Sequence, residues 1–138
     1  MNTSSLASEY LLRATRTLQE STNAFNEGDM YFTIVRGKET LENLASVLLS
    51  LYGILPSSGS PVNVLGYMLE SRELDHDTKV VISEIQDIWR EASFITYVNE
   101  SPTKAPTVLA RQVEVKSFLE RITKTFDKVR EVFDGFHN

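Results

Sequence analysis

Arg90 is the residue whose surroundings suggest chemistry most directly, because Phe94 and Tyr97 follow it at spacings of four and three residues. These spacings place the three side chains on one face of a helix. A guanidinium among aromatic rings can stack on Tyr97, anchor a carboxylate, or hold a phosphate through two hydrogen bonds. A structural role is the simpler interpretation, and phosphate binding is the functional alternative.

A second group of charged residues interrupts a long apolar pattern near the middle of the chain. It consists of Arg36, Lys38, Glu39 and Glu42. Charges in such a helix usually form a solvated face, with pairing worth about 0.3 kcal/mol per pair. The same cations could instead contact a phosphate, so both interpretations stay open at this point.

The apolar pattern around these charges is a helical stripe that contains one glycine. Its members are Ile34, Gly37, Leu41, Leu44, Leu48 and Leu51. Steps of three and four residues put them on one side of a helix. Glycine inside a helix costs about 1 kcal/mol relative to alanine. We therefore expect a neighbouring helix to pass close to Gly37.

Length, composition and charge limit the class of protein. The chain has 138 residues, of which 41% are hydrophobic and 24% are charged, and this composition predicts one folded domain over 1–138. The absence of cysteine excludes disulfides, thiolate metal sites and a thiol nucleophile. A net charge of −5 argues against a broad nucleic-acid surface but allows a small basic patch. The first residues show neither a signal-peptide pattern nor a membrane span, so a cytoplasmic protein is expected.

The periodicity predicts an all-α, up-and-down bundle of four long helices and one short helix. We expect helices from about Ser4 to Asn26, from the Gly28-Asp29 link to about Tyr52, over a short segment from Pro61, from near Asp77 to Val98, and from Pro106 to about Phe133. The connection between the first two helices is so short that they should form an antiparallel hairpin.

The fourth predicted helix has apolar residues on two sides. Ile85, Ile88 and Ala92 form its core row, and Phe94 and Tyr97 lie roughly opposite. A helix with two apolar faces is either central in its bundle or covered by a partner. This pattern predicts a homodimer or partner contact through Phe94, Tyr97 and Val98.

Several segments together resemble the HEPN superfamily, the nucleotide-binding helical domains of higher eukaryotes and prokaryotes. They are the hairpin with its Gly28-Asp29 link, RGKETLENLASVLLSLYG, the short PVNVLGYMLE helix, and WREASFITY before a long last helix. The resemblance covers nearly the whole chain. It implies a dimeric bundle that is often encoded or assembled beside a small nucleotidyltransferase. Some members are metal-independent ribonucleases of toxin and defence systems, and others bind nucleotides or partner proteins.

The ribonuclease motif of the active members is missing from this sequence. Those members carry an arginine followed, after four to six residues, by a histidine that acts on the ribose hydroxyl. Arg90 stands where that arginine is expected, but residues 91–98 contain no histidine. Tyr97 is a poor substitute, because a phenol with a pKa of about 10 is a weak base at neutral pH. Arg72 and His76 are too close together and lie between helices.

Other catalytic or cofactor patterns are absent from the sequence. It has no phosphate-binding glycine loop, no dinucleotide-binding glycine pattern and no zinc-protease motif. Asp75 and Asp77 flank His76, but acidic residues at a helix start are explained by capping. We expect neither a metal nor a cofactor, and nothing in the sequence positively predicts an enzyme.

Two functions of different classes remain. In the first, a non-catalytic HEPN-like module binds nucleotide or RNA phosphate through Arg36, Lys38 and Arg90, with Tyr97 stacking on a base; a nucleotidyltransferase-like protein partner could act with it. In the second, the chain is a dimeric interaction module without a small ligand. A ribonuclease that uses Tyr97 is a third, less favoured possibility. The two leading functions differ in whether the three cations converge on one open cleft, because the binding function fails if they point to separate faces or are neutralised by Glu39, Glu42 and Glu91.

Overall fold

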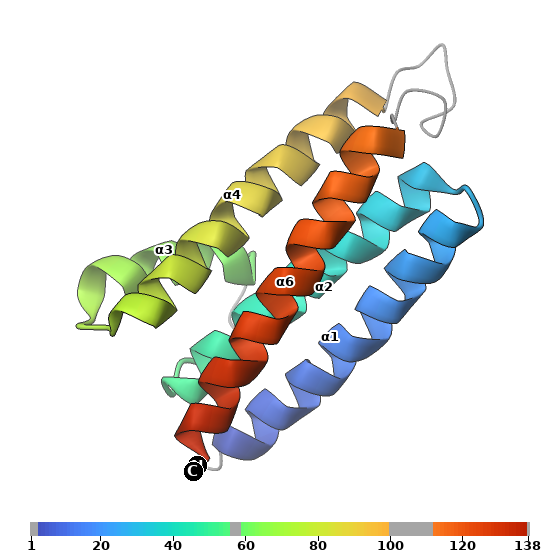
Figure 1. Ribbon diagram of the computed structural model, residues 1–138. Coiled ribbons are helices and arrows are strands. Elements are labelled where there is room, and N and C mark those ends of the chain that lie inside the picture. Colours follow the sequence, from blue (N-terminus) through green and yellow to red (C-terminus); the bar gives the residue numbers. More distant parts are fainter. Residues whose placement is uncertain (1–2, 56–58, 100–111, 138) are drawn as a thin grey trace.

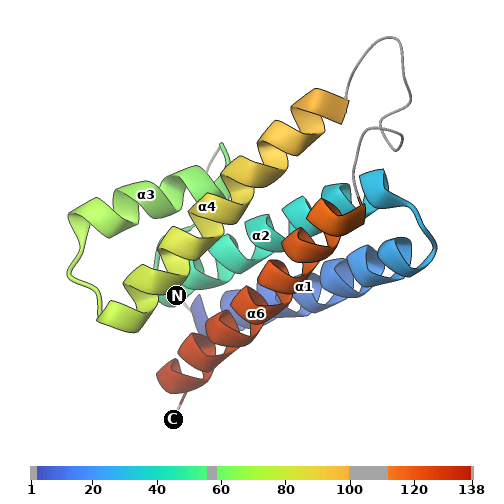
Figure 2. The same cartoon turned by 45° about the horizontal axis from the view of Figure 1, so that its top comes forward.

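The protein is an all-α bundle, and the computed structural model describes residues 3–55, 59–99 and 112–137, without the side chains of Phe94 and residues 96–99. The described helices are α1 (Thr3–Asn26), α2 (Met30–Leu51), α3 (Pro61–Ser71), α4 (His76–Asn99) and α6 (Gln112–Phe136). Four of these helices are long, and Figures 1 and 2 show the short α3 at the side of α4. This arrangement confirms the predicted fold class. The predicted start of the last helix at Pro106 lies outside the described residues.

Helices α1 and α2 form the predicted hairpin. Gly28 turns the chain with a positive φ of 83°, a conformation that glycine adopts without steric cost. Asp29 then caps α2 by accepting a hydrogen bond of 2.9 Å from the Phe32 N–H. The interface between the helices is lined by small residues, and the buried Ser21 hydroxyl donates to the Thr33 carbonyl at 2.6 Å. Small side chains therefore let these two helices approach closely.

The centre of the bundle lies where α2 meets α6. Every predicted stripe residue of α2 from Ile34 to Leu51 is buried. A Cβ atom added to Gly37 would lie 2.6 Å from Phe118 Cε1 and 2.9 Å from Ile122 Cδ1. Both of these α6 side chains are fully buried. The close approach predicted from the cost of this glycine is therefore confirmed, and α6 is the helix that makes it.

Arg121 joins α6 to α4 through two carboxylates. It donates to Glu84 at 3.0 Å and to Glu91 at 2.6 Å, and its own side chain is 33% exposed. Both carboxylates belong to a helix that is distant in sequence, so this ion-pair cluster depends on the tertiary fold.

None of the helices in the described part of the chain is long and apolar enough to cross a membrane.

Candidate functional site

Arg36 is engaged on the side of α2 that faces α1. Its guanidinium donates to Glu39 at 2.6 Å, lies 3.6 Å from a Glu20 carboxylate oxygen on α1, and stacks over the Phe32 ring at 4.5 Å. The side chain is 29% exposed. Two carboxylates and an aromatic ring therefore already surround the cation that the sequence proposed for phosphate binding.

Lys38 points toward α4 instead. Its ammonium lies 4.9 Å from the centre of the Trp89 ring, within the range of a cation–π interaction. Glu42 lies one helical turn further along α2. Burial raises the pKa of Glu42, the positive charge of Lys38 opposes this effect, and Glu39 adds to it. Lys38 thus links α2 to α4 and partly compensates a half-buried carboxylate.

Arg90 lies on the outer surface of α4. Its guanidinium pairs with Asp87 one turn earlier, and its side chain is 73% exposed. Glu91, which the sequence offered as a neutralising partner, instead accepts from Arg121. An exposed ion pair of this kind contributes about 0–1 kcal/mol, so Arg90 can exchange Asp87 for another anion at little cost.

A hollow between α3 and α4 brings Arg90 together with groups that the sequence did not single out. Its volume is about 250 Å³, and Val62, Asn63, Gln86 and Trp89 line it with Arg90. The indole of Trp89 offers an aromatic surface, and the two amides can each donate and accept hydrogen bonds. The lining therefore offers groups that can stack on a ring, hydrogen-bond and pair with an anion.

The three predicted cations do not converge on one open cleft: Arg90 lines the hollow, Lys38 lies next to it, and Arg36 lies elsewhere. Lys38 contacts the same indole that lines the hollow with Arg90. Arg36 faces α1 and shares none of these contacts. The side chains of Phe94, Tyr97 and Val98 lie outside the described part of α4. Their predicted stacking and contact roles therefore stay predictions.

The sequence carries one local signal for the hollow, on the helix that contains Arg90. Gln86, Trp89 and Arg90 follow one another at steps of three and one, which places them at i, i+3 and i+4 on one helix face. Only their partners from α3, Val62 and Asn63, required knowledge of the tertiary fold. Helical spacing alone could have connected an amide, an aromatic ring and a guanidinium.

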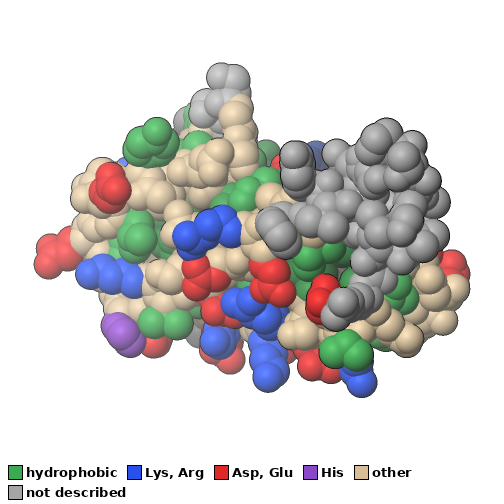
Figure 3. All heavy atoms as spheres, turned by 90° about the horizontal axis from the view of Figure 1, so that it is seen from above, with side chains coloured by type: hydrophobic (Ala, Val, Ile, Leu, Met, Phe, Trp, Pro, Cys, Tyr) green, Lys and Arg blue, Asp and Glu red, His purple; other side chains and the backbone are tan. Residues whose placement is uncertain are grey.

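The charges on the surface seen in Figure 3 are mixed. Lys and Arg side chains lie there among Asp and Glu side chains, without separation into a basic and an acidic half. Mixed charges do not concentrate a polyanion as a basic groove would. A nucleic-acid contact on this face would have to be small and local.

The comparisons with known proteins give a fold and no family. No protein-family model matches the sequence, and no curated protein matches it. The chain is similar in structure to TT1696 from Thermus thermophilus, with a TM-score of 0.66 and 16% sequence identity. The superposition covers 91% of this chain and 96% of the other. At this identity the similarity supports the helical fold.

Proposed function

We propose that this protein is a non-catalytic, HEPN-like module that binds nucleotide or RNA phosphate at the α3–α4 hollow and acts with a nucleotidyltransferase-type partner. The observation that supports this proposal is the combination of Trp89, Asn63, Gln86 and Arg90 around one hollow. They supply a stacking surface for a base, two amides for hydrogen bonds to the base edge or ribose, and a cation for the phosphate. This proposed site replaces the three-cation cleft expected from the sequence, because Arg36 pairs with Glu39 and Glu20 away from the hollow.

Each group has a separate role in the proposal. The indole of Trp89 stacks on a base, an interaction worth about 1–3 kcal/mol per base. Asn63 and Gln86 hydrogen-bond to the base edge or the ribose, and Arg90 holds the phosphate through paired N–H groups. Lys38 contributes positive charge next to the same indole.

The arrangement predicts weak binding with a small salt dependence. Arg90 is the one cation among the described residues that line the hollow. A single phosphate contact to single-stranded RNA gives a slope of log K against log salt of only about −0.7. A steep slope would require many phosphate contacts, and the mixed charges in Figure 3 do not suggest them.

Calorimetric titration with ATP, GTP and a short single-stranded RNA tests this proposal. The matched variants are Arg90→Ala and Arg130→Ala. Both arginines are exposed and both pair with an aspartate three residues earlier, Asp87 and Asp127 respectively. We expect saturable heat that is lost in Arg90→Ala and kept in Arg130→Ala. Equal effects of the two substitutions, or no binding by any of the three ligands, would refute the proposed site.

The second candidate function is homodimerisation or partner binding without a small ligand. The end of α4, which contains Phe94, Tyr97 and Val98, and the start of α6 lie at the same end of the bundle (Figures 1 and 2). Val113 in the first turn of α6 is 80% exposed, which favours a contact there. If this contact forms a dimer, light scattering will give twice the monomer mass for the wild type. Val113→Glu should lower the measured mass toward that of the monomer. A wild-type monomer at high concentration would exclude the dimer.

A further inference from the structure

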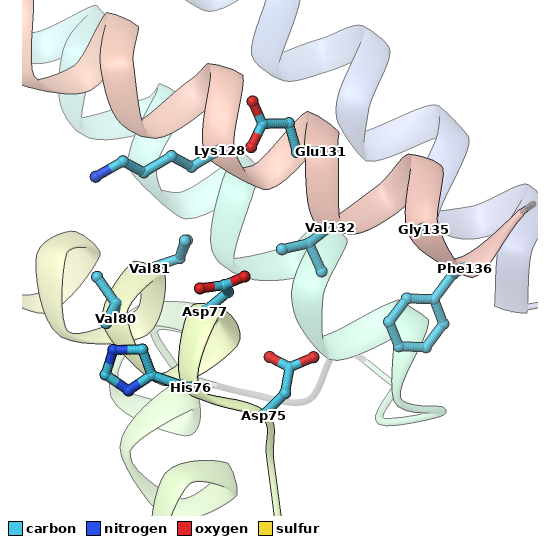
Figure 4. Close-up of a pocket in the computed structure, with 10 residues that line it drawn as sticks. All are labelled: Asp75, His76, Asp77, Val80, Val81, Lys128, Glu131, Val132, Gly135 and Phe136. Carbon is cyan, nitrogen blue, oxygen red and sulfur yellow. The ribbon is translucent and has the colours of Figure 1, made fainter.

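A second hollow, separate from the α3–α4 site, lies between the start of α4 and the end of α6 (Figure 4). Its volume is about 580 Å³. Val80 and Val81 belong to its α4 wall, and Val132 and Phe136 belong to its α6 wall. Figure 4 shows Val81 and Val132 on the facing sides of the two helices, with the carboxylates of Asp75 and Asp77 beside them and Phe136 near the end of α6. The hollow therefore combines apolar side chains on both walls with charged side chains, which are called its rim.

Two large apolar side chains in this hollow remain open to solvent. Val80 is 42% exposed and Phe136 is 48% exposed. Phe136 is also held in place, because its ring meets Tyr52 edge-on with the ring centres 5.2 Å apart. A fixed aromatic ring on one wall and an exposed valine on the other form two anchoring points for an apolar partner. Such points lose little conformational freedom when they become covered.

The rim of the hollow carries more negative than positive charge. The rim has three carboxylates, from Asp75, Asp77 and Glu131, and one ammonium group, from Lys128; His76 also lines it. Asp75 also caps α4, because it accepts a hydrogen bond of 2.7 Å from the Thr78 N–H. The side chain and backbone of Thr78 hold the pKa of Asp75 below its ordinary value, so this carboxylate is ionised at neutral pH. The hollow therefore repels anions and favours a cationic partner.

We propose that this hollow docks an amphipathic helix of a partner protein, with apolar residues on the helix face that enters the hollow and lysine or arginine residues at its borders. The apolar anchors on opposite walls fit the side-on binding of a helix in a groove. The acidic rim selects basic flanking residues and speeds their association. A second copy of this chain is a poorer occupant because its net charge is −5. RNA is a poorer occupant because its phosphates would face the rim carboxylates.

A synthetic helical peptide of leucine and lysine, with leucines at steps of three and four residues, is the probe that tests this proposal. Its binding is followed by fluorescence anisotropy of an attached dye, with a leucine–glutamate peptide of the same pattern as control. We expect saturable binding of the lysine peptide and at least about tenfold weaker binding of the glutamate peptide.

Matched variants of the protein locate the bound peptide. Glu131→Lys reverses a charge at the rim, and Glu120→Lys reverses an exposed charge about three turns earlier on the same helix. We expect Glu131→Lys to weaken binding about tenfold and Glu120→Lys to change it less than about twofold. Val80→Arg replaces an apolar anchor by a cation, so it should also weaken binding of the lysine peptide. Lys128→Glu removes the rim cation, so it should tighten binding of the lysine peptide.

Several results would overturn the proposal. They are the absence of saturable binding by the lysine peptide, equal effects of Glu131→Lys and Glu120→Lys, and displacement of the peptide by single-stranded RNA. All four substituted positions have exposed side chains, so the variants should stay folded, and circular dichroism checks this. The gain of affinity in Lys128→Glu cannot result from unfolding, and its absence would also contradict the proposal.

Discussion

Gly37→Ala is the substitution whose effect the structure determines most sharply. An added Cβ would lie 2.6 Å from Phe118 Cε1, 2.8 Å from Phe118 Cζ and 2.9 Å from Ile122 Cδ1. Carbon atoms pack without strain at about 3.5–4.0 Å, so all three distances are too short. Both α6 side chains are fully buried and have no solvent space into which to move.

The expected magnitude is a balance of two opposing terms. Alanine gains about 1 kcal/mol over glycine from helix propensity. Inserting a methyl group into a packed core costs about 1–3 kcal/mol, and the very short contacts at Gly37 favour the upper part of that range. We expect a net loss of about 1–2 kcal/mol in the free energy of unfolding. For a domain of this size that loss lowers Tm by roughly 3–7 °C.

Urea unfolding followed by circular dichroism measures this loss, with Gly66→Ala as the matched control. A Cβ at Gly66 in α3 would meet only Gln86 Nε2, at 3.1 Å, the end of a flexible side chain that can move away. Gly66→Ala should therefore be neutral or stabilising. If Gly37→Ala were as stable as Gly66→Ala, the close packing of α2 against α6 would be wrong.

A double variant separates the steric cause from other effects. Phe118→Leu removes the ring that an alanine at position 37 would strike. In the Phe118→Leu background, Gly37→Ala should cost less than in the wild type, with a coupling energy of about 0.5–3 kcal/mol. Additive effects of the two substitutions would show that the ring is not the obstacle.

Three further predictions concern stability. Arg121→Met should lower the free energy of unfolding by about 1–2 kcal/mol, because it leaves the two α4 carboxylates without their inter-helix partner; urea unfolding checks this, and an unchanged midpoint would contradict it. Glu42→Gln should raise Tm at neutral pH, because burial disfavours the ionised carboxylate whose pKa is raised. That advantage should shrink as pH falls through the raised pKa, since wild-type Glu42 then becomes neutral, and an advantage that grows in acid would contradict the assignment. Asp75→Ala removes the cap of α4 and should cost about 0.5–2 kcal/mol in thermal unfolding, whereas Asp75→Asn should keep most of the stability as another good capping residue.

The fold could be predicted from the sequence because its signals are local. The stripe from Ile34 to Leu51 and the short Gly28-Asp29 connection each indicate structure within a few residues. Gly37 also predicted a tertiary contact, because the helix stability lost at a glycine has to be compensated by close packing of a neighbouring helix. Such arguments depend on spacing along one chain segment and need no knowledge of the neighbouring helix.

The candidate site could be predicted only in part because it depends on contacts between helices. Arg90 was identified, but the sequence could not show that α3 places Val62 and Asn63 beside it. Arg36 was grouped with Lys38 because they are close in sequence. Side chains that are two residues apart in a helix point to nearly opposite sides, and these two face α1 and α4 respectively. Helical geometry alone could have corrected that grouping.

The most direct test of nucleotide binding at the α3–α4 hollow uses Trp89 itself. It is the single tryptophan of the chain, so its emission reports on this hollow without any label. Titration with ATP, GTP and short single-stranded RNA should change Trp89 fluorescence to saturation, with the same Kd as calorimetry, in the wild type and Arg130→Ala but not in Arg90→Ala. Heat of binding without a change in Trp89 emission would place the ligand elsewhere, and the absence of both signals would contradict the proposed function.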